Sequence, residues 1–227
     1  MVKALKFNSQ GEQIAEIELP AGIFDVDVNA PNILLQEVVT LFLGNQRQGT
    51  VQKKNRAMTA GSTKKLFKQK GTGNARMGQR RTPVRVHGGK AFAILPKDWY
   101  RPIPKTKKRM ALKVALTDRA RDGRIFIVED LSFAKPSTKQ ASELLVKIVP
   151  DKGRKLVVTD GHDLETVKSF NNLPDVMTDR ADSLHAYEIL KSNYIVMTQA
   201  ALDKVSEVFQ SAGNRGAAVS QAEEVLK

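Results

Sequence analysis

The chain has 227 residues, of which 41% are hydrophobic and 27% charged, and its formal net charge is +13. This length and apolar content exclude disorder throughout, because one domain with a substantial core can form. The absence of cysteine excludes disulfides and thiolate metal sites, and no apolar run approaches the roughly 18 to 20 residues that cross a bilayer, so we expect a cytoplasmic protein with no membrane partner.

The first 45 residues are predicted to form the first part of a globular α/β domain. Residues 2–7 and 13–19 are predicted strands, the second because polar and apolar residues alternate along it. A helix follows, with Asn29 as its cap, Pro31 in its first turn and Gly44 at its end. Its apolar face consists of Leu34, Leu35, Val38, Val39 and Phe42.

Residues 46–104 show no regular hydrophobic pattern, and loops longer than about 15 residues are usually functional or disordered. Between Arg47 and Arg109 there are 19 Lys or Arg residues and one acid, Asp98, a net charge of +18. The remaining 18 basic and 23 acidic residues carry a net charge of −5. Such a polycation repels itself unless a polyanion neutralises it, so the segment is predicted to be an extended basic loop that binds RNA.

Regular patterns resume in residues 105–210, the predicted remainder of the globular domain. A helix is expected over 105–121, ended by Gly123, and a second is opened by Ser137 and Gln140 in capping-box spacing. Further helices are expected at 163–170 and 199–210, and strands at 125–128, 156–158, 175–177 and 195–197. Residues 211–227, rich in Gly, Ala and Glu, are predicted to form a flexible tail.

The alternation of strands and helices determines the predicted fold class. Three of the strands are short continuous apolar runs, which is typical of strands covered on both faces. We therefore predict an α/β fold, a three-layer α/β/α domain with a mostly parallel central sheet and a long extended basic loop.

Catalytic, cofactor and metal sites receive little support from the sequence. The motif at 71–76, GTGNAR, lacks the preceding strand and following helix of a phosphate-binding loop. His87, His162 and His185 lack ligand spacing. Asp130 and Asp160 fall at predicted carboxyl ends of strands, where α/β sheets bind ligands, but capping or turn formation is the favoured interpretation. We expect no catalytic residue, cofactor or metal.

The aromatic residues of the basic segment are interpreted in two ways. Phe67 lies among lysines at mid-loop, where an aromatic ring can stack on an unpaired base. Phe92, Trp99 and Tyr100 lie where the chain returns and are expected to pack the base of the loop onto the domain. The candidate RNA-binding residues are Arg47, Lys53, Lys54, Arg56, Lys64, Lys65, Phe67, Lys68, Lys70, Arg76, Arg80, Arg81, Arg85 and Lys90.

Three stretches in the basic segment carry a family resemblance: RQGT at 47–50, KKLFKQKGTGNAR at 64–76 and HGGKAF at 87–92. Their order resembles that in bacterial ribosomal large-subunit protein four, the L-four family. The resemblance extends from the first helix through VMTQAALDKV at 196–205. Two positions differ from the common pattern, since Phe67 replaces Trp and Asn74 replaces Arg.

The resemblance implies a structural protein of the large ribosomal subunit that binds ribosomal RNA, aids assembly and resides in cytoplasmic ribosomes. It also implies that the loop tip helps to line the nascent-peptide exit tunnel, beside a protein of the L-twenty-two family and the nascent polypeptide. The tip positions that match are Lys68, Gln69, Lys70, Gly71, Thr72 and Gly73, after Phe67.

Two other functions are compatible with the residues alone. One is an α/β enzyme acting on nucleic acid, with Asp130 or Asp160 catalytic and the loop as a substrate clamp. The other is a free-standing nucleoid protein or RNA chaperone. An enzyme would keep weak activity on small substrates after loop truncation, and a chaperone would be abundant outside ribosomal particles.

Overall fold

The computed structural model describes residues 2–133, 135–161 and 163–209. The chain divides into two units. One, here called the sheet unit, comprises the described residues up to Phe42 and from Pro102 onward; the other, the basic unit, is Leu43–Arg101. The expected tail at 211–227 and His162 lie outside the described residues.

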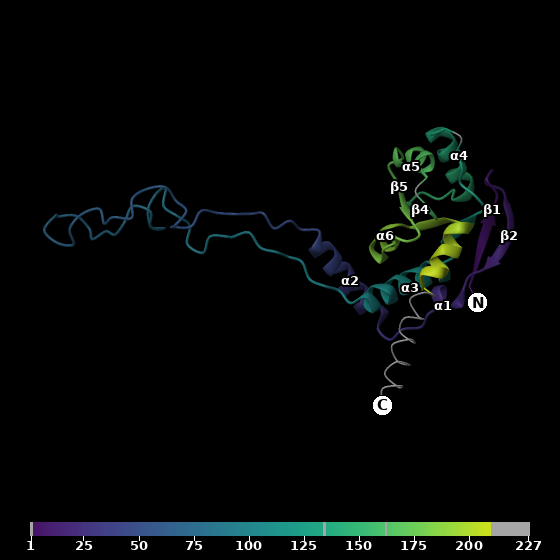
Figure 1. Ribbon diagram of the computed structural model, residues 1–227, viewed down its shortest axis with the longest axis horizontal. Helices are drawn as coiled ribbons and strands as arrows, with labels where there is room; N and C mark the ends of the chain where they lie inside the picture. Colours follow the sequence, from purple (N-terminus) through teal and green to yellow (C-terminus); the bar gives the residue numbers. More distant parts are fainter. Residues whose placement is uncertain (1, 134, 162, 210–227) are drawn as a thin grey trace, which may run out of the picture. The chain divides into compact units, whose positions relative to one another are not determined.

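The sheet unit is built on one six-stranded sheet (Figure 1). Its strands are β1 (Lys3–Phe7), β2 (Gln13–Glu18), β3 (Ile125–Val128), β4 (Lys155–Thr159), β5 (Val176–Arg180) and β6 (Tyr194–Thr198), in the spatial order β2-β1-β3-β6-β4-β5. Only β1 and β2 pair antiparallel, and the other neighbours are parallel. The predicted mostly parallel central sheet is therefore confirmed.

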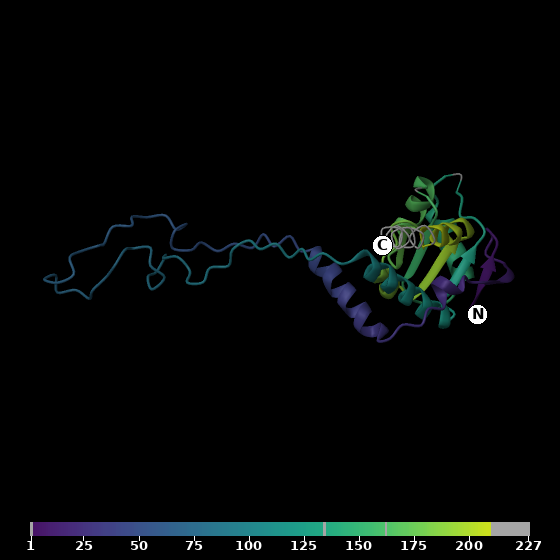
Figure 2. The same ribbon diagram turned by 60° about the horizontal axis from the view of Figure 1, so that its bottom comes forward.

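Helices cover both faces of the sheet (Figure 2). One face carries α1 (Ala21–Phe24), α2 (Pro31–Asn45), α3 (Lys105–Arg121), α6 (Ala186–Lys191) and a helix over 199–209. The other carries α4 (Thr138–Ile148) and α5 (Leu164–Asn171). Phe24, Leu116 and Ile189 are fully buried on the first face, and Phe170 on the second. This arrangement confirms the three-layer α/β/α prediction.

Local sequence signals explain several element ends. The Ser137 side chain accepts a hydrogen bond from the Gln140 backbone N–H at 3.5 Å and caps α4. After α3, Gly123 adopts a φ of 67°, and the Arg124 N–H donates to the Arg119 carbonyl at 2.9 Å, the expected helix stop. Among the helices of residues 2–133, 135–161 and 163–209, none is both long and apolar enough to span a membrane.

The structure adds two helices that the sequence did not predict. Both are short: α1 has four residues and α6 has six. A helix of one or two turns offers too few positions for a 3.6-residue pattern to be recognised. The strand expected at 175–177 is longer than predicted and runs to Arg180. The prediction ended too early because the last residues of this edge strand are polar and carry no apolar signal.

Candidate nucleic-acid interface

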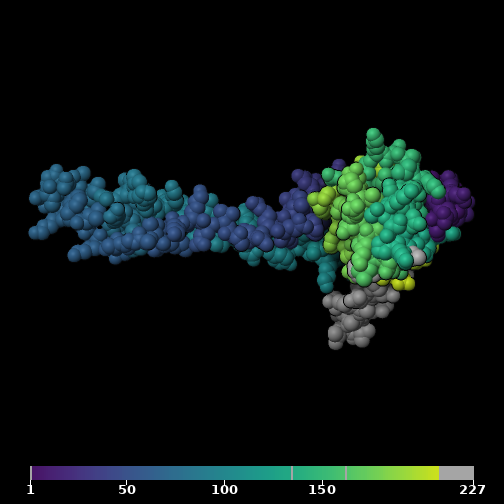
Figure 3. Space-filling model, turned by 90° about the horizontal axis from the view of Figure 1, so that it is seen from above, coloured from purple at the N-terminus to yellow at the C-terminus, as the bar shows by residue number. Residues whose placement is uncertain are grey.

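The two arms of the basic unit are joined at their base by backbone contacts. The Asn45 side-chain amide donates to the Arg101 carbonyl at 2.9 Å and accepts from the Arg101 N–H at 2.8 Å. Further along, the Lys97 N–H donates to the Gly49 carbonyl at 3.1 Å. A Cβ at Gly49 would lie 1.9 Å from the Lys97 carbonyl oxygen, so only glycine permits this approach. Figure 3 shows the side chains of the two arms, in blue and teal.

Aromatic residues near this base do not behave as predicted. The Trp99 ring is contacted by the Arg47 guanidinium at 4.2 Å and the Lys97 ammonium at 4.6 Å, both within the basic unit. Phe92 is fully exposed and the Tyr100 side chain is 66% exposed. The prediction that these rings pack onto the domain is therefore wrong for Phe92 and Tyr100.

The middle of the basic unit is held by a set of contacts that we call the clasp, formed by residues 55–59 and 81–89. The Arg81 guanidinium donates to the carbonyls of Ala57, at 3.2 Å, and Thr59, at 2.9 Å. The Gly89 N–H donates to the Arg81 carbonyl at 3.0 Å. Gly89 is buried, and a Cβ there would lie 2.4 Å from the Arg56 backbone nitrogen. The clasp therefore depends on a close backbone crossing.

The tip lies beyond a single antiparallel bridge between Lys65 and Gln79. Gly71 and Gly73 adopt φ values of 82° and 68°, and a Cβ at either would meet nothing within 4 Å. The residues 68–73 are all exposed, whereas Phe67 is half-buried. The tip is thus an open turn whose side chains are accessible.

Cations of the basic unit fall into two groups. Five cations have partners: Arg47 and Lys97 on Trp99, Lys65 on Gln69, Arg81 in the clasp and Arg85 on Met77. The other candidate cations, together with Arg101, are exposed and form no side-chain hydrogen bond or ion pair with any residue that the structure describes. These free cations are Lys53, Lys54, Arg56, Lys64, Lys68, Lys70, Arg76, Arg80, Lys90 and Arg101.

The sheet unit contains both acids and cations, and some of them form ion pairs. Its ion pairs include Lys107 with Glu37 at 2.8 Å and Arg121 with Asp25 at 3.0 Å. Within the described parts of the chain, all six ion pairs lie in the sheet unit. The excess positive charge lies in the basic unit, where Asp98 is the one acid, and this is the arrangement expected of a phosphate-binding surface.

Within the described residues, Asp130 and Asp160 do not belong to any cluster of acids or histidines that could hold a metal. Both are exposed, and the Asp160 carbonyl accepts a hydrogen bond from the Lys204 ammonium at 2.6 Å. The cap positions of the following helices are occupied by Ser137 and Asp163, so the favoured capping role of Asp130 and Asp160 is wrong. Among the residues described, no three His, Asp or Glu side chains come together as a metal site.

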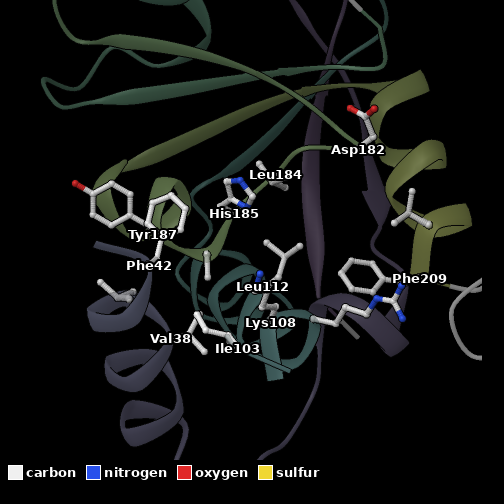
Figure 4. A pocket seen from close by; sticks show the side chains of 14 residues that line it. Val38, Phe42, Ile103, Lys108, Leu112, Asp182, Leu184, His185, Tyr187 and Phe209 are labelled. Atoms are coloured by element: carbon white, nitrogen blue, oxygen red, sulfur yellow. The ribbon is translucent and has the colours of Figure 1, made fainter. Parts of the chain in front are cut away.

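A cavity of about 310 Å³ lies in the sheet unit between α2, α3, α6 and the helix at 199–209 (Figure 4). Its lining is mainly apolar, and neither Asp130 nor Asp160 contributes to it. The Phe42 ring lies 5.3 Å from the His185 ring and 5.5 Å from the Tyr187 ring. Stacked aromatic side chains of α2 and of the start of α6 therefore form part of the cavity wall.

The one carboxyl group with a large pKa shift among the described residues is Glu188 on α6. Its pKa is raised to about 7, first by burial and then by a hydrogen bond and repulsion with Asp179 on β5. The Ser183 hydroxyl donates to Asp179 at 2.6 Å. This pair lies in the sheet unit and links β5 to α6.

Comparison with known proteins identifies the family. The model of the Ribosomal protein L4/L1 family matches residues 17–208. Large ribosomal subunit protein uL4 of Natranaerobius thermophilus is 37% identical over 209 residues, covering 92% of this chain and 100% of the relative. Those of Carboxydothermus hydrogenoformans and Finegoldia magna are 39% and 40% identical, each covering 92% of this chain and 100% of the relative.

These matches confirm the resemblance seen in the basic segment. Proteins of this family are structural components of the large ribosomal subunit, so the alternative of a nucleic-acid enzyme is wrong. The family model spans the end of β2, the whole basic unit and the sheet unit from α1 to residue 208, and on this match the chain belongs to the ribosomal protein L4/L1 family.

Proposed function

We propose that the chain binds large-subunit ribosomal RNA through its basic segment, residues 46–104, and thereby aids assembly of the subunit. Residues 1–45 and 105–210 form the globular part in this division. The candidate contacts are those predicted from the sequence, with Arg81 and the other partnered cations contributing through positioning as well as charge.

One observation carries this proposal: ten exposed Lys and Arg side chains of the basic unit have no partner within the described residues. The sheet unit contains acids that pair with six of its cations, whereas the basic unit contains one acid, Asp98. RNA phosphates supply the missing negative charge, and the release of their counterions favours binding.

We also propose that the tip, Lys68–Gly73, lines the nascent-peptide exit tunnel, next to a protein of the L-twenty-two family and in contact with the nascent polypeptide. The support is family membership together with the exposure of every tip residue. An open turn at Gly71 and Gly73 can approach a narrow passage closely, because a Cβ added at either glycine would have no neighbour within 4 Å.

The test is the salt dependence of RNA binding. Full-length protein and a variant in which a short linker replaces residues 47–101 are titrated with large-subunit ribosomal RNA at several salt concentrations. If all ten free cations contact phosphates, the slope of log K against log salt approaches about −7 to −9. The variant should lose most of this slope.

Substitution of the ion-paired Lys107 by Ala is the matched control, since that lysine is already neutralised by Glu37. It should leave the slope nearly unchanged. An equal slope for the linker variant and the full-length protein would overturn the assignment of RNA binding to the basic unit.

A further inference from the structure

Phe92 lies at the apex of a bulge between the two arms of the basic unit. On one arm the adjacent residues Lys53 and Lys54 form consecutive cross-arm hydrogen bonds: the Lys53 N–H donates to the Ile94 carbonyl at 2.8 Å, and the Lys54 carbonyl accepts from the Lys90 N–H at 3.0 Å. On the other arm, residues 91–93 lie between these two rungs. These three residues therefore have no counterpart on the opposite arm and form a bulge.

The backbone at this bulge presents the ring to solvent. Phe92 has a φ of 49°, in the left-handed region that non-glycine residues rarely adopt, and its side chain is fully exposed. Ala91 and Ala93 flank it and leave both faces of the ring clear of large neighbours. Strained backbone that places an aromatic ring in water persists at functional sites, where a ligand covers the exposed group.

The charges around the bulge indicate which ligand. Lys53, Lys54 and Lys90, which bear the rungs on either side, are exposed and have no side-chain partner within the described residues. An apolar protein surface covering Phe92 would have to bury these ammonium groups without neutralising them. Single-stranded or bulged RNA provides a base for the ring and phosphates for the lysines.

We infer that Phe92 is a stacking platform for an unpaired nucleobase of ribosomal RNA, with Lys53, Lys54 and Lys90 holding the adjacent phosphates. This inference rests on the proposed RNA-binding function and adds to it a base contact, at a residue that the sequence assigned to packing. The clasp contributes by positioning, because Gly89 and the Lys90 rung fix the chain that leads into the bulge.

The test uses the full-length protein and large-subunit ribosomal RNA. Phe92→Leu keeps an apolar side chain but removes the aromatic face, whereas Phe92→Tyr keeps the ring. Phe92→Leu should bind about 5- to 100-fold more weakly at fixed salt, and Phe92→Tyr should bind like the wild type. The salt slope should be the same for all three, because no phosphate contact is removed. Ultraviolet cross-linking of wild type should join Phe92 to an unpaired nucleotide.

Val51→Ala is the control, since Val51 is an exposed apolar residue of the basic unit outside both the bulge and the clasp, at 64% exposure. It should change affinity less than about twofold. Equal affinity of Phe92→Leu and wild type would overturn the inference while leaving the proposed function intact, and so would a cross-link from Phe92 to a neighbouring ribosomal protein in assembled subunits. A wild type without salt-dependent binding would overturn both.

Discussion

The backbone hydrogen-bonding groups of the sheet unit and of the basic unit find their partners in different ways. In the sheet unit, parallel strands and seven described helices supply regular hydrogen bonds, and two apolar cores cover the sheet. In the basic unit, two irregular arms meet at isolated rungs, at close glycine crossings and at the Arg81 clasp. Apolar burial therefore stabilises the first, whereas the second relies on a few specific contacts and leaves its charges available.

The largest expected effect is on the free energy of unfolding, and it is tested by the same Leu→Ala substitution in each unit. Leu156→Ala removes a fully buried side chain from β4 and should lower the free energy of unfolding by about 2 to 5 kcal/mol. Leu66→Ala removes a side chain that is 43% exposed in the basic unit and should cost less than about 0.5 kcal/mol. Urea denaturation measures both, and comparable losses would contradict the comparison.

A smaller effect on stability is expected from adding a side chain at the close backbone crossing of the clasp. Gly89→Ala places a Cβ against the Arg56 backbone, so the crossing must open. Hydrogen exchange at the Gly89 and Lys90 amides should accelerate by about tenfold or more, while the unfolding transition of the sheet unit stays in place. Gly78→Ala is the control, because a Cβ there meets nothing within 4 Å. A shift of the whole transition by Gly89→Ala would show that the units unfold together.

The next prediction concerns pH and is confined to the sheet unit. Because the pKa of Glu188 is raised from 4.5 to about 7 in the folded state, its contribution to stability is full below pH 4.5 and is lost as the pH rises through 7. Since the side chain is partly exposed to solvent, which screens the interaction, we expect a loss of about 1 kcal/mol. Glu188→Gln should remove this slope from thermal unfolding between pH 5 and 8.

Asp179→Asn tests the partner of that group. It removes the repulsion and should bring the pKa of Glu188 down toward its ordinary value. Its unfolding profile should then be flatter than that of the wild type in the same pH range. A wild-type profile that does not decline across this range would contradict the assigned shift.

The smallest expected effect on stability is a charge reversal at the tip. Lys70→Glu changes one exposed cation, worth about 0 to 1 kcal/mol, so assembly into particles should continue. If the tip lines the tunnel, chemical footprints of the RNA near the constriction should change locally. Lys108→Glu, an equally exposed cation on α3, should leave them alone. Identical footprints for Lys70→Glu and wild type would contradict the proposal that the tip lines the tunnel.

Much of the sheet unit could be predicted from sequence because its signals are local and repeated. The bounds of α3 and β3 match the prediction, since an apolar face, Gly123 and the IFIV run mark them. The strand order could not be predicted, because apolar runs such as Ile125–Val128 do not specify which neighbours they pair with. Short helices were missed for lack of a measurable period.

The charge pattern predicted where the basic unit lies in the chain, but the sequence did not predict its conformation. The count of cations located it, whereas the clasp depends on backbone carbonyls that have no side-chain signature. The adjacent glycines at 88 and 89 are the one sequence signal for this close backbone crossing. Phe92 was expected to pack because it lies where the chain returns to the domain, and only the bulge reveals its exposure.

The position of the basic unit in the chain has a consequence for synthesis. Strand β1 takes its parallel neighbour from about 120 residues later, since Leu5 lies beside Phe126. At about 5 to 20 residues per second, a growing chain needs roughly 6 to 24 s to make that neighbour. During this interval the β1–β2 hairpin has no partner on one edge, and the cations of the basic unit emerge before the sheet closes. The chain is therefore exposed to RNA while its own domain is still incomplete.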